Sequence, residues 1–357
     1  MKHTFNTAAA VLILLFSTGC WKKTPDIPVK PVDFSGLDEN SGVWETLLAL
    51  GESPPEHYLA DFPDETIEAG KELVFTGKAK NPETGLPGPR ISDYFYCTDC
   101  HNVKAEEPNI ASVSDSIVKL EHATSNKLPL LQGSTFAGMV NRETWYNGDY
   151  AKKYRFSLAV RAARKSLRES IKLCSRECSQ GRDPLPWEEE AMLAYFWTLE
   201  WKLSNLGYTS ADVAELKRRA LDPASRSGIV SEIKAKYALT SPATFSGMPE
   251  DGKAGYPVEG EKDLKVGQII WEQSCLHCHG AEGASEHYFG DKPDVWSSLA
   301  RKFKSSSKKS VYGFIRLGTH PEEGKRPYMP NYTTERLSDK QIEDLRAYIE
   351  SKAAEAK

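Results

Sequence analysis

Apolar residues recur along much of the chain at the three- and four-residue spacing of helices with one buried face. Five segments follow this amphipathic pattern, namely Glu68–Phe75, Trp187–Leu203, Ser210–Arg219, Leu264–Trp271 and Ser338–Lys352. In the last segment, Ser338 and Gln341 have the spacing of a capping box, which predicts that the helix begins there. The pattern therefore predicts a mainly α fold.

The first twenty residues carry a different pattern. Ala8–Phe16 is an unbroken apolar run behind Lys2, and the small residues Ser17–Gly19 lead to Cys20. A run of about 9 apolar residues is too short to span a bilayer and is typical of a secretory signal peptide. The end of this segment resembles the lipobox of bacterial lipoproteins, which implies that Cys20 carries a lipid. We expect an exported protein of the periplasm or cell envelope, with ordinary cleavage without lipid as the alternative.

Composition adds little to this picture. Residues 21–64 begin with a stretch rich in Pro and charge, and we expect a tether and a leading segment there. The remaining chain is long enough for two domains of ordinary size. A net charge of −4 and a pI near 6 give no signal for nucleic-acid binding. No second apolar stretch reaches the length of a membrane span.

The cysteines carry the strongest chemical signal. Cys97–His101 and Cys275–His279 are two C-x-x-C-H motifs, the signature of covalent haem attachment. A redox pair or half a zinc site is the alternative, but no βαβ pattern surrounds either motif. We predict two covalently attached haem c groups, since each Cys adds to a vinyl group and the adjoining His binds iron. The predicted haem-binding residues are Cys97, Cys100, Cys275 and Cys278, with His101 and His279 as iron ligands.

The helical pattern repeats around the two motifs. A helix with Gly at the same place precedes each motif, and a helix with Ala-Tyr at matching places closes each copy. This layout resembles the cytochrome c fold, whose first and last helices cross beside the haem edge. The resemblance implies two tandem cytochrome c-like helical domains, each around one haem. The expected division is a signal peptide at 1–20, a tether and leading segment at 21–64, a first domain at 65–205, a helical and irregular linker at 206–257, and a second domain at 258–357.

Met329 is the candidate for the sixth iron ligand of the second haem. It lies between Tyr328 and Pro330, far enough after His279 for a loop to reach the opposite haem face. This segment resembles the Met loop of cytochromes c, and a thioether ligand raises the potential. A Met that only fills the core, or ligation by His320, is the alternative.

The sixth ligand of the first haem has several candidates. Met139 is one, and the two remaining cysteines, Cys174 and Cys178, are others. Cys178 precedes the first closing helix by 9 residues, and Met329 precedes the second by the same interval. In an oxidising compartment the two thiols could instead form a disulfide, which favours Met139. His122 lies in a polar stretch and is the weakest candidate.

A second resemblance bears on these cysteines. The segment Leu167–Gly181 is similar to a stretch of dihaem thiosulfate dehydrogenases and of the related SoxA cytochromes, and so are Lys127–Leu130 and the domain order. In those dehydrogenases a Cys thiolate at the position of Cys174 ligates the active-site haem, and a Ser stands where this chain has Cys178. The resemblance implies a catalytic Cys174 and a small sulfur oxyanion, such as thiosulfate, as substrate. The insertion Phe136–Tyr154 is longer than in that family.

The region around these cysteines is basic. Nine Lys and Arg residues lie between Ala151 and Arg176, against Glu169 alone. Such a face would lower a thiol pKa, bind a sulfur oxyanion or dock an acidic redox partner, but it is also typical of a solvated helix. We therefore favour an electron carrier that serves redox protein partners. The alternative is an oxidoreductase acting on a sulfur oxyanion at the first haem, with the second haem passing electrons out.

Overall fold

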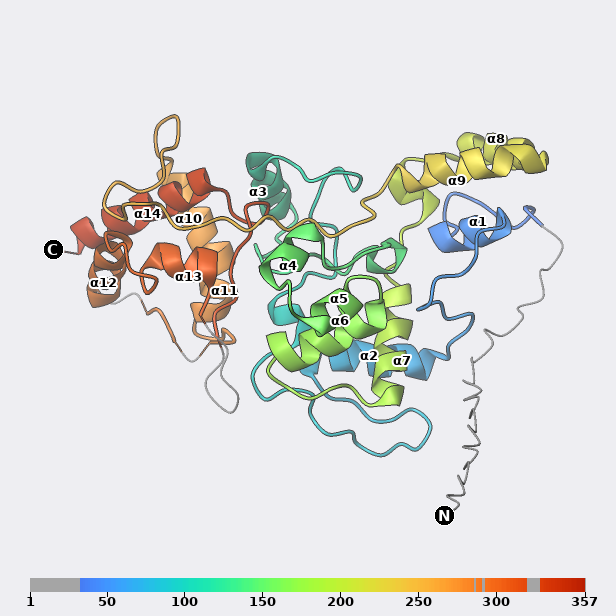
Figure 1. Cartoon of the computed structure of the whole chain (residues 1–357), viewed down its shortest axis with the longest axis horizontal. Helices are drawn as coiled ribbons and strands as arrows, with labels where there is room; N and C mark the ends of the chain where they lie inside the picture. The colour runs from blue at the N-terminus through green and yellow to red at the C-terminus, as the bar shows by residue number, and fades with distance from the viewer. Residues whose placement is uncertain (1–32, 286, 291–292, 320–327, 357) are drawn as a thin grey trace, which may run out of the picture.

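The computed structural model describes residues 33–285, 287–290, 293–319 and 328–356. Within these ranges the chain is helical and contains isolated bridges but no strand, which confirms the predicted mainly α fold. The helices form three groups along the long axis, with α10 to α14 at one end and α1, α8 and α9 at the other (Figure 1). None of the described helices is both long and apolar enough to cross a bilayer. The predicted signal segment and Cys20 lie outside the described residues.

Helices α2 (Asp64–Thr76) and α7 (Pro186–Trp197) cross in the middle group, and we call the segment from α2 to α7 the first unit. Gly70 lies at the crossing. A Cβ atom there would stand well inside van der Waals contact of the Ala191 carbonyl oxygen and 3.0 Å from Tyr195 Cβ. Only glycine allows the two backbones to approach so closely.

Helices α10 (Leu264–Ile270) and α14 (Asp339–Glu355) repeat this crossing in the second unit, which runs from α10 to α14. A Cβ atom on Gly267 would stand inside contact distance of the Asp344 carbonyl oxygen and 2.8 Å from Tyr348 Cβ. In both units the glycine of the first helix therefore packs on the last helix, one turn before its Tyr. This is the crossing of first and last helices that the resemblance to the cytochrome c fold implies.

Two predicted helix ends have different outcomes. Ser338 Oγ accepts a hydrogen bond from the backbone N–H three residues later, and α14 begins at the next residue, as the capping box predicts. The prediction that the other closing helix reaches Leu203 is wrong, because α7 ends at Trp197. The residues beyond this end bind another segment, since the Leu199 carbonyl accepts from the Gly138 N–H at 2.7 Å.

Shorter elements complete both units. The first unit also contains η1 (Cys97–Asp99), α3 (Ser116–Ser125), η2 (Met139–Asn141), α4 (Gly148–Lys153), α5 (Leu158–Ala163), α6 (Leu167–Leu173) and the π-helical turn η3 (Cys174–Cys178). The second unit also contains the π-helical turn η6 (Trp271–Cys275), α11 (Leu276–His279), α12 (Pro293–Phe303) and α13 (Val311–Leu317).

The predicted linker packs on the first unit. It contains α8 (Ser210–Ala220), η5 (Pro223–Ser225) and α9 (Arg226–Lys234), and the short turn η4 (Leu203–Leu206) leads into it. Helix α8 confirms the helix predicted at 210–219. Val213 and Ile233 from these helices share a hydrophobic core with Trp44 and Leu47 of α1 (Val43–Ala49) and with the first unit. The linker helices therefore enlarge the first core.

Helix α3 belongs to the first unit in sequence but to the second in packing. Its residues Leu120 and Ala123 are buried in one apolar cluster with Ile342 of α14. Leu128 and Leu130, which follow α3, are buried in the same cluster. The two units are thus joined by apolar contacts as well as by the linker.

Candidate haem sites

The first C-x-x-C-H motif forms a single tight turn. Cys97 to Asp99 make the 3₁₀ turn η1, and the His101 N–H donates to the Cys97 carbonyl at 3.0 Å. The Asp99 carboxylate accepts from the Tyr96 N–H at 2.7 Å and fixes the start of the turn. Cys97 and Cys100 are partly exposed free thiols. The turn therefore brings both thiols and the imidazole to one side of the chain.

The imidazole of His101 is held in one orientation. Its Nδ1 lies 2.6 Å from the Ser134 carbonyl oxygen, and because a carbonyl only accepts, Nδ1 carries the proton. The ring stacks on Phe136, with centroids 4.5 Å apart and planes 15° from parallel. A Cβ on Gly133 would lie 2.5 Å from Nδ1, so the ring needs glycine there. Nε2 is left as the unprotonated nitrogen, which is free to bind a metal.

The second motif has the same arrangement. The π-helical turn η6 leads into α11, and His279 Nδ1 lies 2.7 Å from the His287 carbonyl oxygen. The His279 ring stacks on Phe289, with centroids 4.1 Å apart and planes 18° from parallel. Each motif thus combines two thiols, a carbonyl-bound Nδ1 and a stacked Phe. This donor set fits covalent haem with histidine as an axial ligand.

Burial sets the protonation of both motifs. It lowers the pKa of His101 to about 4 and also lowers that of His279, so both imidazoles are neutral at pH 7, the form that binds metals. Burial also raises the pKa of Cys97 and Cys275 to about 12. The unreacted thiols are therefore uncharged.

The two motifs face each other across the boundary between the units. His277 of the second motif lies close to Asp99 of the first, whose charge and backbone oppose the lowering of the His277 pKa by burial. Burial is the main cause that raises the pKa of the Cys100 thiol, and the nearby Cys278 is the next. Tyr332 lies close to thiols of both motifs. Any groups bound at the two motifs are therefore neighbours.

Cys174 and Cys178 lie beside the first motif. They begin and end the π-helical turn η3 and are both free thiols, so the disulfide considered from the sequence is not formed in the structure. The neighbouring Cys174 thiol is the main cause that lowers the pKa of Cys178, because it stabilises the charged form. The nearby hydroxyls of Tyr328 and Tyr146 lower the pKa of Cys178 further. Both thiols are near enough to influence the Cys100 thiol or to be influenced by it.

Aromatic residues surround this thiol pair. Tyr146 packs edge-on against Tyr150 at 4.8 Å, and Tyr328 packs edge-on against Phe95 at 6.2 Å. Tyr328 comes from the second unit and precedes Met329, so both units contribute to this site. The sequence reasoning did not identify Tyr146 or Tyr328 as site residues. For Tyr146, the unusual density of tyrosines in the insertion Phe136–Tyr154 was the signal that could have marked it as a site residue.

Gln180 is a further site residue that the sequence did not predict. Its backbone has a φ of 55°, which is rare outside glycine. Both polar atoms of its side-chain amide are buried and have no hydrogen-bond partner among the described residues. Strained backbone and unpaired buried polar groups concentrate at functional sites. Its position two residues after Cys178 places this strain beside the thiol pair.

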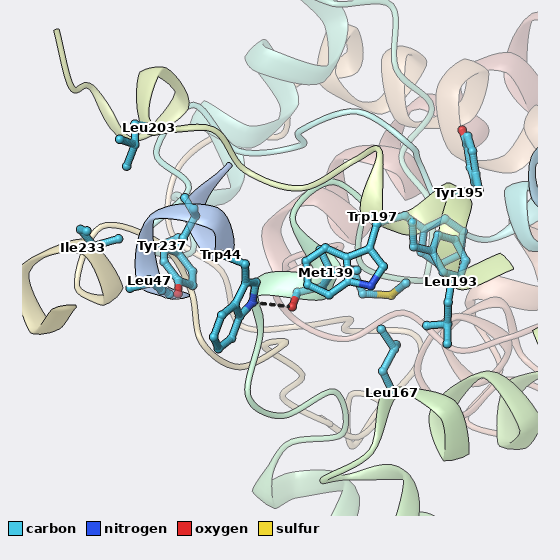
Figure 2. Close-up of a cluster of buried hydrophobic side chains, with 14 of the residues drawn as sticks. Trp44, Leu47, Met139, Leu167, Leu193, Tyr195, Trp197, Leu203, Ile233 and Tyr237 are labelled. Atoms are coloured by element: carbon cyan, nitrogen blue, oxygen red, sulfur yellow. Dashed lines mark hydrogen bonds between the residues drawn. The ribbon is translucent and has the colours of Figure 1, made fainter. Parts of the chain in front are cut away.

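The methionine candidates lie in different surroundings. Met139 is buried in the first core, in the cluster that contains Trp44 and Trp197 (Figure 2). Met329 is partly exposed on the second core, and the Thr319 N–H donates to its carbonyl at 2.9 Å. Of the two weaker candidates, His122 bonds the Ala105 carbonyl at 3.2 Å. His320 lies outside the described residues.

Part of the predicted basic face is paired with carboxylates, through Lys152, Arg168, Lys172 and Arg176. Arg168 forms ion pairs with Glu56, Glu189 and Glu190, and Lys172 forms them with Glu169 and Glu189. The run itself contains a single acidic residue, Glu169, and the other partner carboxylates come from outside the run. In the described part of the chain, Arg161, Arg164 and Lys165 of the same run have no ion pair.

One comparison with known families gives a match. Residues 262–349 match the family described as cytochrome C oxidase, cbb3-type, subunit III. This stretch contains α10, the second motif and most of α14, so this part of the chain is a c-type cytochrome domain. Such a domain binds haem c covalently and transfers electrons with redox partners. No curated protein was found to match the chain.

Proposed function

We propose that this protein is an exported dihaem c-type cytochrome that transfers electrons between redox proteins in the periplasm or cell envelope. The observation that carries the proposal is the repeated site. Each motif has a histidine Nδ1 bonded to a backbone carbonyl and a Phe stacked on the imidazole. Each unit also has a glycine at the matching position of its helix crossing, Gly70 in the first and Gly267 in the second. The family match supports one copy directly, and the repetition extends the assignment to the other.

In this proposal the first unit corresponds to a domain at 65–205 and the second to a domain at 258–357, joined by the linker. The four motif cysteines hold the haems as thioethers, and His101 and His279 supply one axial ligand each. A haem at each motif supplies a one-electron Fe(III)/Fe(II) couple. The chain keeps each Nε2 unprotonated and, through the contact of His277 with Asp99, keeps the two motifs next to each other.

For the sixth ligands we propose Met329 at the second motif and a thiolate from Cys174 or Cys178 at the first. The lowered pKa of Cys178, which the nearby Cys174, Tyr328 and Tyr146 cause, supports a thiolate beside that motif. The burial of Met139 among tryptophans supports a packing role for it. The anchor in this proposal is a lipid on Cys20.

The haem content tests the main proposal. Mass spectrometry and the pyridine haemochrome assay are expected to give two haems per chain. The paired replacements Cys97→Ala with Cys100→Ala, and Cys275→Ala with Cys278→Ala, should each leave one. A single haem in the unmodified protein contradicts the proposal. For the anchor, Cys20→Ala is expected to move the protein out of the membrane fraction, and retention there contradicts lipidation.

An oxidoreductase acting on a sulfur oxyanion is the second candidate. The thiol pair beside the first motif, with Tyr146 and Tyr328 next to Cys178, favours it. In this reading, coupling of two thiosulfates to tetrathionate releases two electrons, which leave through the second site to an acceptor protein. Thiosulfate is expected to reduce the purified dihaem protein, and Cys174→Ala to abolish this reduction. Failure of thiosulfate to reduce either haem excludes this substrate.

A further inference from the structure

A single peptide group connects His101 to a buried carboxylate. The Ser134 carbonyl oxygen accepts from His101 Nδ1 at 2.6 Å, and the N–H of the same peptide group, on Thr135, donates to Glu106 Oε2 at 3.1 Å. The imidazole and the carboxylate therefore bind opposite ends of one peptide dipole. A negative charge at the N–H end pushes electron density of the peptide group toward the carbonyl oxygen, which becomes a stronger hydrogen-bond acceptor.

Glu106 is built to stay charged in this position. It is 6% exposed, and its other oxygen accepts from Asn102 Nδ2 at 2.8 Å. Arg336 Nη1 donates to Glu106 Oε2 at 2.5 Å. Burial opposes ionisation, but Arg336 and then Lys119 hold the pKa of Glu106 below its usual value.

The counter-charge comes from the other unit. Arg336 is 7% exposed and lies between Met329 and α14, so the second unit supplies the cation that faces the axial histidine of the first. A third group, the partly buried Arg142, donates to the Ser134 hydroxyl and to the Thr135 carbonyl. Burial lowers the pKa of Arg142 to about 10, so it remains a cation at pH 7.

Among the residues that the structure describes, the second motif lacks this arrangement. His279 Nδ1 also bonds a backbone carbonyl, that of His287. However, no carboxylate of the described residues accepts from the next N–H, on Tyr288. Within the described residues, the two otherwise similar sites therefore differ in whether a carboxylate binds the peptide group that accepts from the axial histidine.

We infer that Glu106 and Arg336 set the electron density of the His101 imidazole through the 134–135 peptide group, so that the second unit helps to fix the potential of the first haem. A group that accepts a hydrogen bond from Nδ1 of a histidine that binds metal through Nε2 raises the basicity of the imidazole. A more basic imidazole stabilises Fe(III) and lowers the potential. Glu106 is thus a positioning and tuning residue, and Arg336 moderates its charge. The inference rests on the proposed haem at Cys97–His101.

Redox titration of the dihaem protein, with the two haems resolved spectroscopically, tests the inference. Glu106→Gln keeps the shape and an acceptor oxygen but removes the charge. We expect it to raise the potential of the first haem, changing its Fe(III)/Fe(II) ratio at fixed solution potential by about tenfold, or about 59 mV. Glu106→Asp, which restores a carboxylate, is expected to return the potential toward the starting value.

Glu107→Gln is the matched control. Glu107 is the adjacent carboxylate and pairs with Lys119 at 2.5 Å, but it does not bond the 134–135 peptide group. The net charge changes equally in both variants, so a shift confined to Glu106→Gln and to the first haem supports the inference. Equal shifts in the two variants, or no shift, overturn it.

A double variant keeps the inference testable if Glu106→Gln alone does not fold. Glu106→Gln leaves Arg336 buried without its partner, which can prevent folding. The double variant Glu106→Gln with Arg336→Gln removes both charges and is expected still to raise the potential of the first haem. An unchanged potential in this variant overturns the inference. A protein with only one haem refutes the proposed function instead, which the haemochrome assay detects separately.

Discussion

Replacing Gly70 or Gly267 by Ala adds a methyl group where two helices touch. In each case the nearest atom is a backbone carbonyl oxygen of the facing helix, on Ala191 or Asp344, which cannot rotate away as a flexible side chain does. The helices must separate, and overpacking of this kind costs about 1–3 kcal/mol. Because the added atom would also press on a Tyr Cβ, we expect the upper part of this range.

Gly228 provides the matched control. It lies inside α9, and a Cβ atom there would meet nothing within 4 Å. Gly228→Ala therefore gains only helix propensity, about 0.5–1 kcal/mol. The same gain offsets part of the cost at the crossings, so we expect Gly70→Ala and Gly267→Ala to lose about 2 kcal/mol net.

Urea unfolding of the haem-loaded protein measures these effects. With an m-value of about 2 kcal/mol/M, a loss of about 2 kcal/mol lowers the midpoint by about 1 M. Far-UV circular dichroism reports the helices, and Soret absorbance reports the haem environment. The crossing variants and the control are expected to shift the midpoint in opposite directions. If Gly70→Ala and Gly267→Ala raise the midpoint as Gly228→Ala does, the reasoning about close helix contact is refuted.

Three further predictions follow from other sites. Met139→Leu is expected to leave the absorption and EPR spectra of the first haem unchanged, whereas Cys178→Ala should alter them; the reverse result would assign Met139 as the ligand. Ser338→Ala removes the cap of α14 and should cost about 1 kcal/mol in urea unfolding, and an unchanged midpoint would show that the cap is dispensable. Burial raises the pKa of Glu200 to about 7. Because the folded state then keeps a proton that the unfolded chain releases, the free energy of unfolding should fall by up to about 3 kcal/mol between about pH 4.5 and 7. Glu200→Gln should abolish this fall, and a slope that persists would locate its origin elsewhere.

The features that sequence predicted well depend on local spacing. The start of α14 followed from Ser338 and the capping partner three residues later, so neighbouring residues determine this feature. The helix crossings at Gly70 and Gly267 were instead implied by the resemblance to the cytochrome c fold. The order of the motifs within each repeat likewise requires no knowledge of how distant segments meet.

The features that sequence missed depend on contacts between distant residues. Glu106 and Arg336 are 230 positions apart, and neither has a neighbour that signals the pairing. The ion pairs of Arg168 in the basic run were missed because its partner Glu56 is more than 100 residues away. The end of α7 was placed too late because its periodic pattern continues to Leu203, although the backbone there is needed by another segment.

The packing of α3 into the second core has a consequence for how the protein matures. During synthesis α3 emerges well before α10 to α14, so its apolar face has no partner until the rest of the chain has followed. The first half therefore cannot complete its structure alone, and cutting the chain in the linker would expose apolar surface on both pieces. We expect the two halves to reach their final structure together. The distance between their motifs is then set when the chain folds, and it does not depend on a later association of two finished halves.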